Sequence, residues 1–125
     1  MPQTDALSLL GDLIARATKA GADAADAVLF ESASLSHAQR LGKVEKLERS
    51  ESYDLGLRVL IGKRQAIVSS NDRSPAALNE VIERAIAMAK TVPEDPYCGL
   101  AAPEELARDW PALDLEDPSE PAPER

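Results

Sequence analysis

At 125 residues the chain is long enough for one domain with its own hydrophobic core and too short for two. Hydrophobic residues make up 44% and charged residues 29%, as in ordinary globular proteins, and no apolar run approaches the roughly 20 residues of a membrane-spanning helix. The single cysteine, Cys98, excludes an internal disulfide, and residues 1–5 lack the basic and apolar regions of a secretory signal. We therefore expect a cytoplasmic protein that is not bound to a membrane.

The net charge of −8 is unevenly distributed along the chain. Residues 1–92 hold 12 acidic and 12 basic side chains, whereas residues 93–125 hold 10 acidic and 2 basic ones together with seven of the nine prolines. This shift predicts a folded domain over residues 1–92 and an acidic, proline-rich linker over residues 93–125. Nucleic acid is disfavoured as a partner, because a neutral domain with an acidic tail would repel a phosphate backbone.

Apolar residues at helical spacing predict a first helix over residues 6–19. Thr4 or Asp5 can cap its start, because their side-chain oxygens can accept from the first free backbone N–H groups. Gly21 stands where helices commonly end, since glycine adopts the left-handed conformation of a C-terminal cap without strain.

A second helix is predicted to begin at Ser74-Pro75, which has the form of an N-cap followed by proline at the first helical position. It is expected to end at Val92-Pro93, because the residue before a proline disfavours the helical conformation. Its apolar face comprises Leu78, Val81, Ile82, Ala85 and Ala89.

The region between the helices predicts four strands. Alternating side chains indicate strands over residues 26–36 and 55–61, and Gly62-Lys63 provides a tight turn into a last strand over residues 65–70. Residues 39–52 fit either a helix or a strand, and we favour a strand because Leu41-Gly42 would make a hairpin turn. The predicted fold class is therefore α+β: a helix, a four-stranded, antiparallel meander sheet, a second helix and then the acidic tail.

These residues contain no complete catalytic constellation, so no catalytic, cofactor-binding or metal-binding residue is predicted. A zinc site needs three or four ligands in a defined geometry, whereas the chain has one His and one Cys, 61 positions apart. His37 lies in a polar stretch and is expected to be an ordinary solvated residue. Cys98 lies between prolines with no neighbouring base and is expected to be an inert thiol.

Two further patterns resemble functional motifs without meeting their requirements. Gly56 and Gly62 belong to no phosphate-binding loop, and the hairpin turn already explains Gly62. Charges of alternating sign are typical of a solvated face rather than of paired catalytic carboxylates. The residues in question are Lys43, Glu45, Lys46, Glu48, Arg49 and Glu51.

Several short segments stand out by their order and spacing. They are residues 21–28 after the first helix, 42–45 and 55–59 in the strands, 72–75 before the second helix, and 94–101 with Leu113-Asp114-Leu115 beyond. In this order they resemble the N-terminal domain of the TldD/PmbA family, the proteins once described as modulators of DNA gyrase. The Asp-Pro-x-x-Gly-Leu-Ala turn at residues 95–101 is similar to the PmbA (TldE) branch of that family.

The resemblance implies a part in proteolysis. Family members form a TldD–TldE heterodimer that acts as a metalloprotease on peptides and small unfolded proteins, with the zinc motif in the TldD subunit. A PmbA-like chain would itself be non-catalytic and hold no cofactor, and its partners would be a zinc-binding TldD-type subunit and a peptide or unfolded protein substrate. The alternative is a stand-alone module that regulates a partner such as gyrase without proteolysis.

An open edge strand is the feature of this predicted sheet that could contact a substrate. The long, polar segment over residues 26–36 could pair its backbone with an extended peptide.

Overall fold

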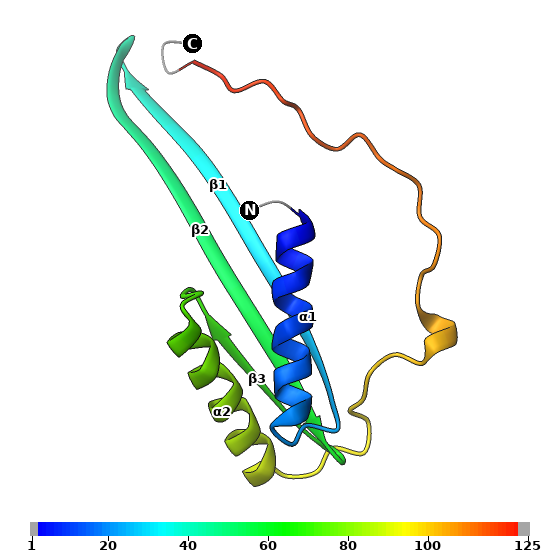
Figure 1. The fold of residues 1–125 in the computed structure, drawn as a ribbon. Helices are drawn as coiled ribbons and strands as arrows, with labels where there is room; N and C mark the ends of the chain where they lie inside the picture. The colour runs from blue at the N-terminus through cyan, green and yellow to red at the C-terminus, as the bar shows by residue number, and fades with distance from the viewer. Residues whose placement is uncertain (1–2, 123–125) are drawn as a thin grey trace. The chain divides into compact units, whose positions relative to one another are not determined.

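The computed structural model describes residues 3–122, which form two helices, three strands and one 3-10 turn (Figure 1). The helices are α1 (Gln3–Lys19) and α2 (Pro75–Thr91), and the 3-10 turn η1 spans Pro103–Glu105. The strands β1 (Ala24–Arg40), β2 (Lys43–Ile61) and β3 (Arg64–Ser70) form one sheet in the order β1–β2–β3. The α+β class and the helix–sheet–helix order are confirmed.

The chain divides into two compact units. Unit 1 covers the chain up to Ser32 together with Glu51–Leu100, and unit 2 covers Ala33–Ser50 together with the chain from Ala101 onward. Strands β1 and β2 therefore each contribute to both units. Within residues 3–122, no helix has the length and apolar character needed to cross a membrane.

The prediction of four strands is wrong, because the second and third predicted strands are one continuous strand, β2. All side chains from Lys43 to Ser52 are exposed, whereas Leu55, Leu57 and Val59 are fully buried. Alternation of apolar and polar residues exists only where one face of a strand is covered. The pattern therefore changes within β2 although the backbone continues without a break.

Both predicted hairpin turns are present, and both depend on residues with positive φ. Leu41 (φ 53°) and Gly42 (φ 75°) join β1 to β2, and both central positions of a type I′ turn require this conformation. Gly62 (φ 58°) begins the turn from β2 to β3, which then pair antiparallel from Ile61 opposite Arg64 to Leu55 opposite Ser70.

Helix α1 ends at Lys19 as predicted, but it begins at Gln3, earlier than predicted. The helix already includes Thr4 and Asp5 in its first turn, so neither residue is its cap. An acidic residue in this turn is still favourable, because Asp5 lies near the positive end of the helix dipole. At the other end Gly21 has φ 122°, and the N–H of Ala22 donates to the carbonyl of Ala17 (3.1 Å), which is the bond of a Schellman cap.

Helix α2 begins as the sequence predicts. The Oγ of Ser74 accepts a hydrogen bond from the N–H of Ala77 (3.2 Å), and Pro75 occupies the first helical position. We expect Ser74→Ala to lower the free energy of unfolding by about 1 kcal/mol, because one backbone donor then loses its partner. Urea unfolding would measure this change, and Ser69→Ala, at an exposed position in β3, is the control. An equal loss in both variants would contradict the capping role.

The core lies between the helices and one face of the sheet. The buried positions of α2 include its whole predicted apolar face, and Leu13 and Ala17 of α1 complete the helical side. The sheet contributes alternate residues of β2 and β3: Leu55, Leu57, Val59, Ala66 and Val68. Because side chains alternate along a strand, the intervening residues of β2 and β3 face away from this core.

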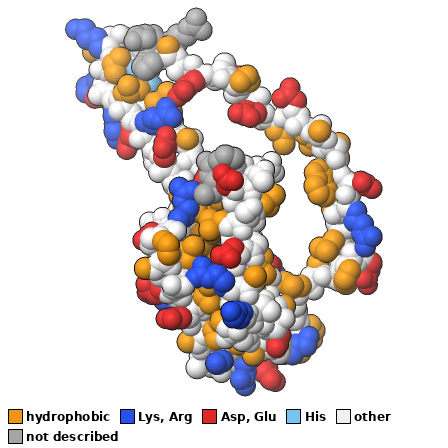
Figure 2. All heavy atoms as spheres, in the orientation of Figure 1, with side chains coloured by type: hydrophobic (Ala, Val, Ile, Leu, Met, Phe, Trp, Pro, Cys, Tyr) orange, Lys and Arg blue, Asp and Glu red, His pale blue; other side chains and the backbone are white. Residues whose placement is uncertain are grey.

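The segment after α2 has two parts. Residues 93–100 belong to unit 1, where the N–H of Asp95 donates to the carbonyl of Lys63 (2.7 Å) and Cys98 is buried. Farther on, hydrophobic side chains stand exposed among acidic ones along an extended chain (Figure 2). Trp110, Leu113 and Leu115 are 75%, 65% and 84% exposed.

Candidate functional site

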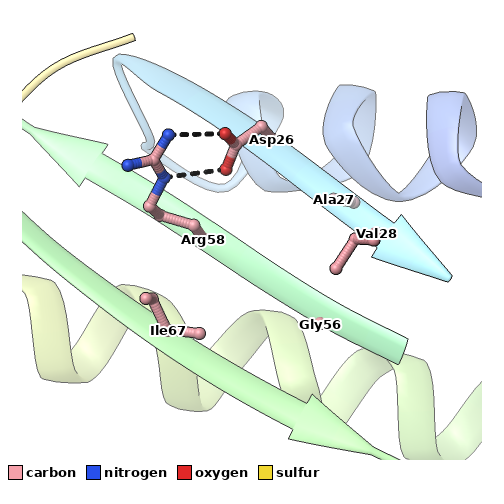
Figure 3. A pocket seen from close by; sticks show the side chains of 6 residues that line it. All are labelled: Asp26, Ala27, Val28, Gly56, Arg58 and Ile67. Atoms are coloured by element: carbon pink, nitrogen blue, oxygen red, sulfur yellow. Dashed lines mark hydrogen bonds and ion pairs between the residues drawn. The ribbon is translucent and has the colours of Figure 1, made fainter. Parts of the chain in front are cut away.

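A hollow lies on the face of the sheet that points away from the helices in unit 1 (Figure 3). It has a volume of about 290 Å³. All three strands contribute to its lining, which consists of Asp26, Ala27, Val28, Gly56, Arg58 and Ile67. Gly56 and Arg58 are the residues that alternate with the buried Leu55, Leu57 and Val59, so the same β2 segment forms the core on one face and this hollow on the other.

The hollow depends on Gly56, because this residue has no side chain to fill the space next to Val28. A Cβ at this position would lie 3.3 Å from Cγ1 of Val28, which is closer than about nine in ten real Cβ contacts. A larger residue would therefore push Val28 aside and fill the space between the strands. The φ of Gly56 is not positive, so the requirement for glycine comes from this contact and not from the backbone conformation.

An ion pair forms one wall of the hollow. The guanidinium of Arg58 donates twice to the carboxylate of Asp26, from Nε to Oδ1 (2.9 Å) and from Nη2 to Oδ2 (2.6 Å). These hydrogen bonds to Asp26 raise the pKa of Arg58, because they favour its charged form. Both carboxylate oxygens of Asp26 are therefore engaged, and the pair joins β1 to β2 instead of offering a free acid or base.

The pair is expected to stabilise the contact between β1 and β2 by only about 1 kcal/mol. The Arg58 and Asp26 side chains are 30% and 49% exposed, so solvent screens their attraction. A double-mutant cycle with Asp26→Asn and Arg58→Gln, followed by urea unfolding, would measure this coupling free energy. The surface pair Lys46–Glu48 provides a control, for which we expect less than about 0.5 kcal/mol. Equal coupling free energies in the two pairs would show that the bidentate geometry of Arg58 and Asp26 contributes no additional stability.

The hollow is surrounded by exposed apolar side chains. Val28 is 62% exposed, and Phe30 and Ile67 are each 64% exposed, although Leu57 on the other face is fully buried. Val28 and Phe30 are two positions apart in β1 and so share a face. Clustered exposed apolar residues are typical of a surface that contacts another molecule. We call Val28, Phe30, Gly56 and Ile67 the open face.

One end of this sheet face is already covered by the chain itself. Leu60 of β2 is only 4% exposed, and Cys98 is 7% exposed. Nζ of Lys63 donates to the carbonyl of Cys98 (3.5 Å), and the N–H of Asp95 donates to the carbonyl of Lys63 (2.7 Å). Residues 95–98 therefore cover the Leu60 end of the face, which leaves the open face as its uncovered part.

The residues weighed for chemistry do not gather at this site. His37 is half-buried rather than solvated, and it lies in unit 2, whereas Cys98 is a buried, free thiol in unit 1. The charged run on β2 is exposed, and Lys46 pairs with Glu48 at 3.0 Å. Within residues 3–122, no three His, Cys, Asp or Glu side chains are grouped so that they could hold a metal ion. The described residues therefore do not fit a zinc site.

Sequence reasoning did not identify the open face or the Asp26–Arg58 pair. The sequence did contain one signal of the open face. Val28, Phe30, Ser32 and Ser34 lie on the same face of β1, and this face is apolar at its first two positions and polar at the next two. A strand that is apolar on both faces over part of its length is usually covered on both sides in that part, whereas Val28 and Phe30 are exposed here. The ion pair had no local signal, because its partners are 32 positions apart.

Comparison with known proteins assigns this α+β domain to a class. The family model described as PmbA/TldA metallopeptidase domain 1 matches residues 25–89, which is more than half of the chain. The chain belongs to this PmbA/TldD family.

Two curated relatives have similar sequences. The chain is 34% identical over 102 residues to Metalloprotease PmbA of Escherichia coli O157:H7, a match that covers 82% of this chain and 23% of that protein. It is 38% identical over 99 residues to a Metalloprotease PmbA homolog of Haemophilus influenzae, with coverage of 79% and 22%. The chain thus spans less than a quarter of the length of these relatives.

Two crystal structures share the fold. A Bacteroides thetaiotaomicron protein described as a candidate modulator of DNA gyrase has a TM-score of 0.80 at 21% identity, over 90% of this chain and 25% of that one. TldE from Thermococcus kodakarensis has a TM-score of 0.69 at 20% identity, over 85% and 24%. In both cases the similarity covers one part of a longer chain.

Proposed function

We propose that this chain is the N-terminal domain of a PmbA/TldE-type subunit in a heterodimeric TldD–TldE metallopeptidase of the cytoplasm, and that it is itself non-catalytic. Family membership and similarity to the curated PmbA proteins support the proposal. In it, residues 1–92 are the domain proper and residues 93–125 are the linker toward a C-terminal domain. The zinc ion and the catalytic residues belong to the TldD-type partner, and the substrates are peptides and small unfolded proteins.

The open face is the observation that carries this proposal. It offers apolar side chains around a hollow, and the charged residues at its edge, Asp26 and Arg58, already satisfy each other. Such a surface suits binding to another protein surface rather than chemistry on a small molecule. We therefore place the contact of this domain with the rest of the peptidase complex on the open face.

The decisive experiment combines this chain with a TldD-type partner and measures cleavage of an unfolded peptide. We expect more cleavage with both proteins than with the partner alone, no cleavage by this chain alone, and loss of cleavage when a chelator removes the metal. A partner that is equally active with and without this chain would contradict the proposal.

Substrate contact is a finer part of the proposal. Strand β1 is at one edge of the sheet, so its outer backbone groups can pair with an extended peptide. Ser34→Pro would remove a backbone N–H from the edge strand β1 and is expected to weaken peptide binding at least about tenfold. Ser34→Ala is the matched control, and circular dichroism would verify that both variants keep their sheet. Equal peptide affinity for all three chains would exclude pairing at this edge.

A second candidate is a stand-alone regulatory module without proteolysis. It is favoured by the similarity to the Bacteroides protein described as a candidate gyrase modulator. Supercoiling assays with gyrase distinguish the two: the module predicts a change in gyrase activity when this chain is added without any TldD-type protein, and the peptidase subunit predicts none.

A further inference from the structure

The two strands of unit 2 form a hairpin arm, residues 33–50, with the turn Leu41-Gly42 at its tip. Leu35 and Leu47 on this arm are 39% and 49% exposed, whereas Leu41 at the tip is 94% exposed. The two leucines away from the tip are thus partly covered, although unit 2 contains no helix of more than three residues to cover them within the described chain.

A segment from the end of the described chain lies against these leucines. We call residues 114–122 the strap. One groove is lined by Leu35, Leu47 and Arg49 from the arm and by Glu120, Pro121 and Ala122 from the strap. Nη1 of Arg49 donates to Oε1 of Glu120 at 2.5 Å, so an ion pair closes this groove.

The strap has local order beside Glu120. Both the N–H and the hydroxyl of Ser119 donate to Oδ1 of Asp117, at 2.9 and 2.7 Å. These two hydrogen bonds lower the pKa of Asp117. The resulting Asx turn spans Pro118, whose φ is fixed by its ring, and it reduces the number of conformations available to Glu120 and Pro121.

The charges of the arm and of the segment that follows unit 1 are complementary. Residues 33–50 carry four basic and two acidic side chains. Residues 101–122 carry seven acidic side chains and one basic one. Opposite net charges favour association of the two parts of unit 2, although salt screens this attraction.

His37 of the arm provides a separate observation. It shares a strand face with Leu35, because the two are two positions apart in β1. Its Nε2 is shielded from solvent and has no hydrogen-bond partner among residues 3–122. An imidazole on an uncovered two-stranded arm would instead reach water, so the shielding indicates that this face is covered.

The fold comparison extends into the same part of the chain. The Bacteroides structure matches 90% of this chain, or about 112 residues, whereas residues 1–100 supply only 100. The match therefore extends past Leu100 into the later part of the chain.

From these observations we infer that the arm is a docking site for an extended, acidic, proline-containing segment, and that the chain's own strap occupies it. Arg49 binds the Glu120 carboxylate, and Leu35 and Leu47 provide the apolar side of the groove next to Pro121. Release of the strap would remove one wall of this groove and expose Leu35, Leu47 and Arg49, so the strap controls access to these residues of the arm.

Charge reversal on the whole 125-residue chain tests this inference. Arg49→Glu and Glu120→Arg are each expected to release the strap and to accelerate thermolysin cleavage beside Leu113 and Leu115 about threefold to tenfold. The double variant restores an ion pair of opposite polarity and is expected to return the cleavage rate to within about twofold of wild type. Arg40→Glu and Glu116→Arg are matched controls that reverse charge outside the groove, and we expect less than about a twofold change from them.

Backbone order parameters from NMR provide the second readout. In the wild-type chain residues 117–122 should approach the rigid range near 0.85, and in either single reversal they should fall below about 0.6. Values below about 0.6 in the wild type would overturn the inference, and so would a double variant that is cleaved as fast as the single ones. Equal acceleration by the control reversals would also overturn it, because net charge alone would then explain the effect.

Discussion

Replacing Leu57 by alanine is expected to lower the free energy of unfolding by about 3 kcal/mol. Leu57 is fully buried in the centre of β2, and leucine-to-alanine changes at such positions cost about 2–5 kcal/mol, because the core cannot fully close the cavity. A domain of this size has a total stability of about 5–15 kcal/mol, so the loss is a large fraction of it. Urea unfolding followed by circular dichroism would measure the shift.

The matched control is Leu115→Ala. Leu115 is 84% exposed, so the same chemical change should alter the free energy of unfolding by less than about 0.5 kcal/mol. A loss below about 1 kcal/mol in Leu57→Ala would mean that the core between sheet and helices is loosely packed. A change in the m-value, which is the slope of the free energy of unfolding against urea concentration, would instead indicate an altered unfolded state.

The double variant Val28→Asp/Ile67→Asp is expected to weaken binding to a TldD-type partner by at least about a hundredfold. Both side chains are more than 60% exposed on the open face, so the isolated chain loses little on their replacement. In a complex they would be buried, and a buried, unpaired carboxylate costs several kcal/mol. Titration calorimetry with wild-type and variant chains would measure the dissociation constants.

Leu7→Asp is the control for this experiment. Leu7 is 62% exposed, but it lies on α1 and not on the open face. We expect its affinity for the partner to stay within about twofold of wild type, while thermal unfolding verifies that all variants remain folded. If both variants lose affinity equally, the interface is not confined to the open face. If neither does, this face is not where the partner binds.

Local structure was predictable wherever one or two adjacent residues determine the backbone. Ser74-Pro75 predicts the start of α2, and Gly62 predicts the turn between β2 and β3, because both depend on short-range sterics and hydrogen bonds. The strand count was not predictable in the same way. Polar residues around Ser52 interrupt the alternation without interrupting the backbone, and no glycine or proline lies between Lys43 and Leu55 to break β2.

The candidate site depended on contacts between segments that are distant in the sequence. Asp26 and Arg58 each look like ordinary surface charges until the pairing of β1 with β2 brings them within 2.6 Å. Likewise Val28 and Ile67 come from different edges of the sheet, and only its three-stranded order places them around Gly56.

The sequence by itself determined the fold class and the family resemblance, because composition, turn signals and motif spacing are local properties of the chain. The tertiary structure decided which apolar residues stay exposed, how Arg58 is engaged, and where the acidic segment returns to Arg49. The physical reason is that exposure and ion pairing depend on the neighbours that folding brings together. The open face and the strap are therefore features of the folded domain, although each is built from residues that are unremarkable in the sequence.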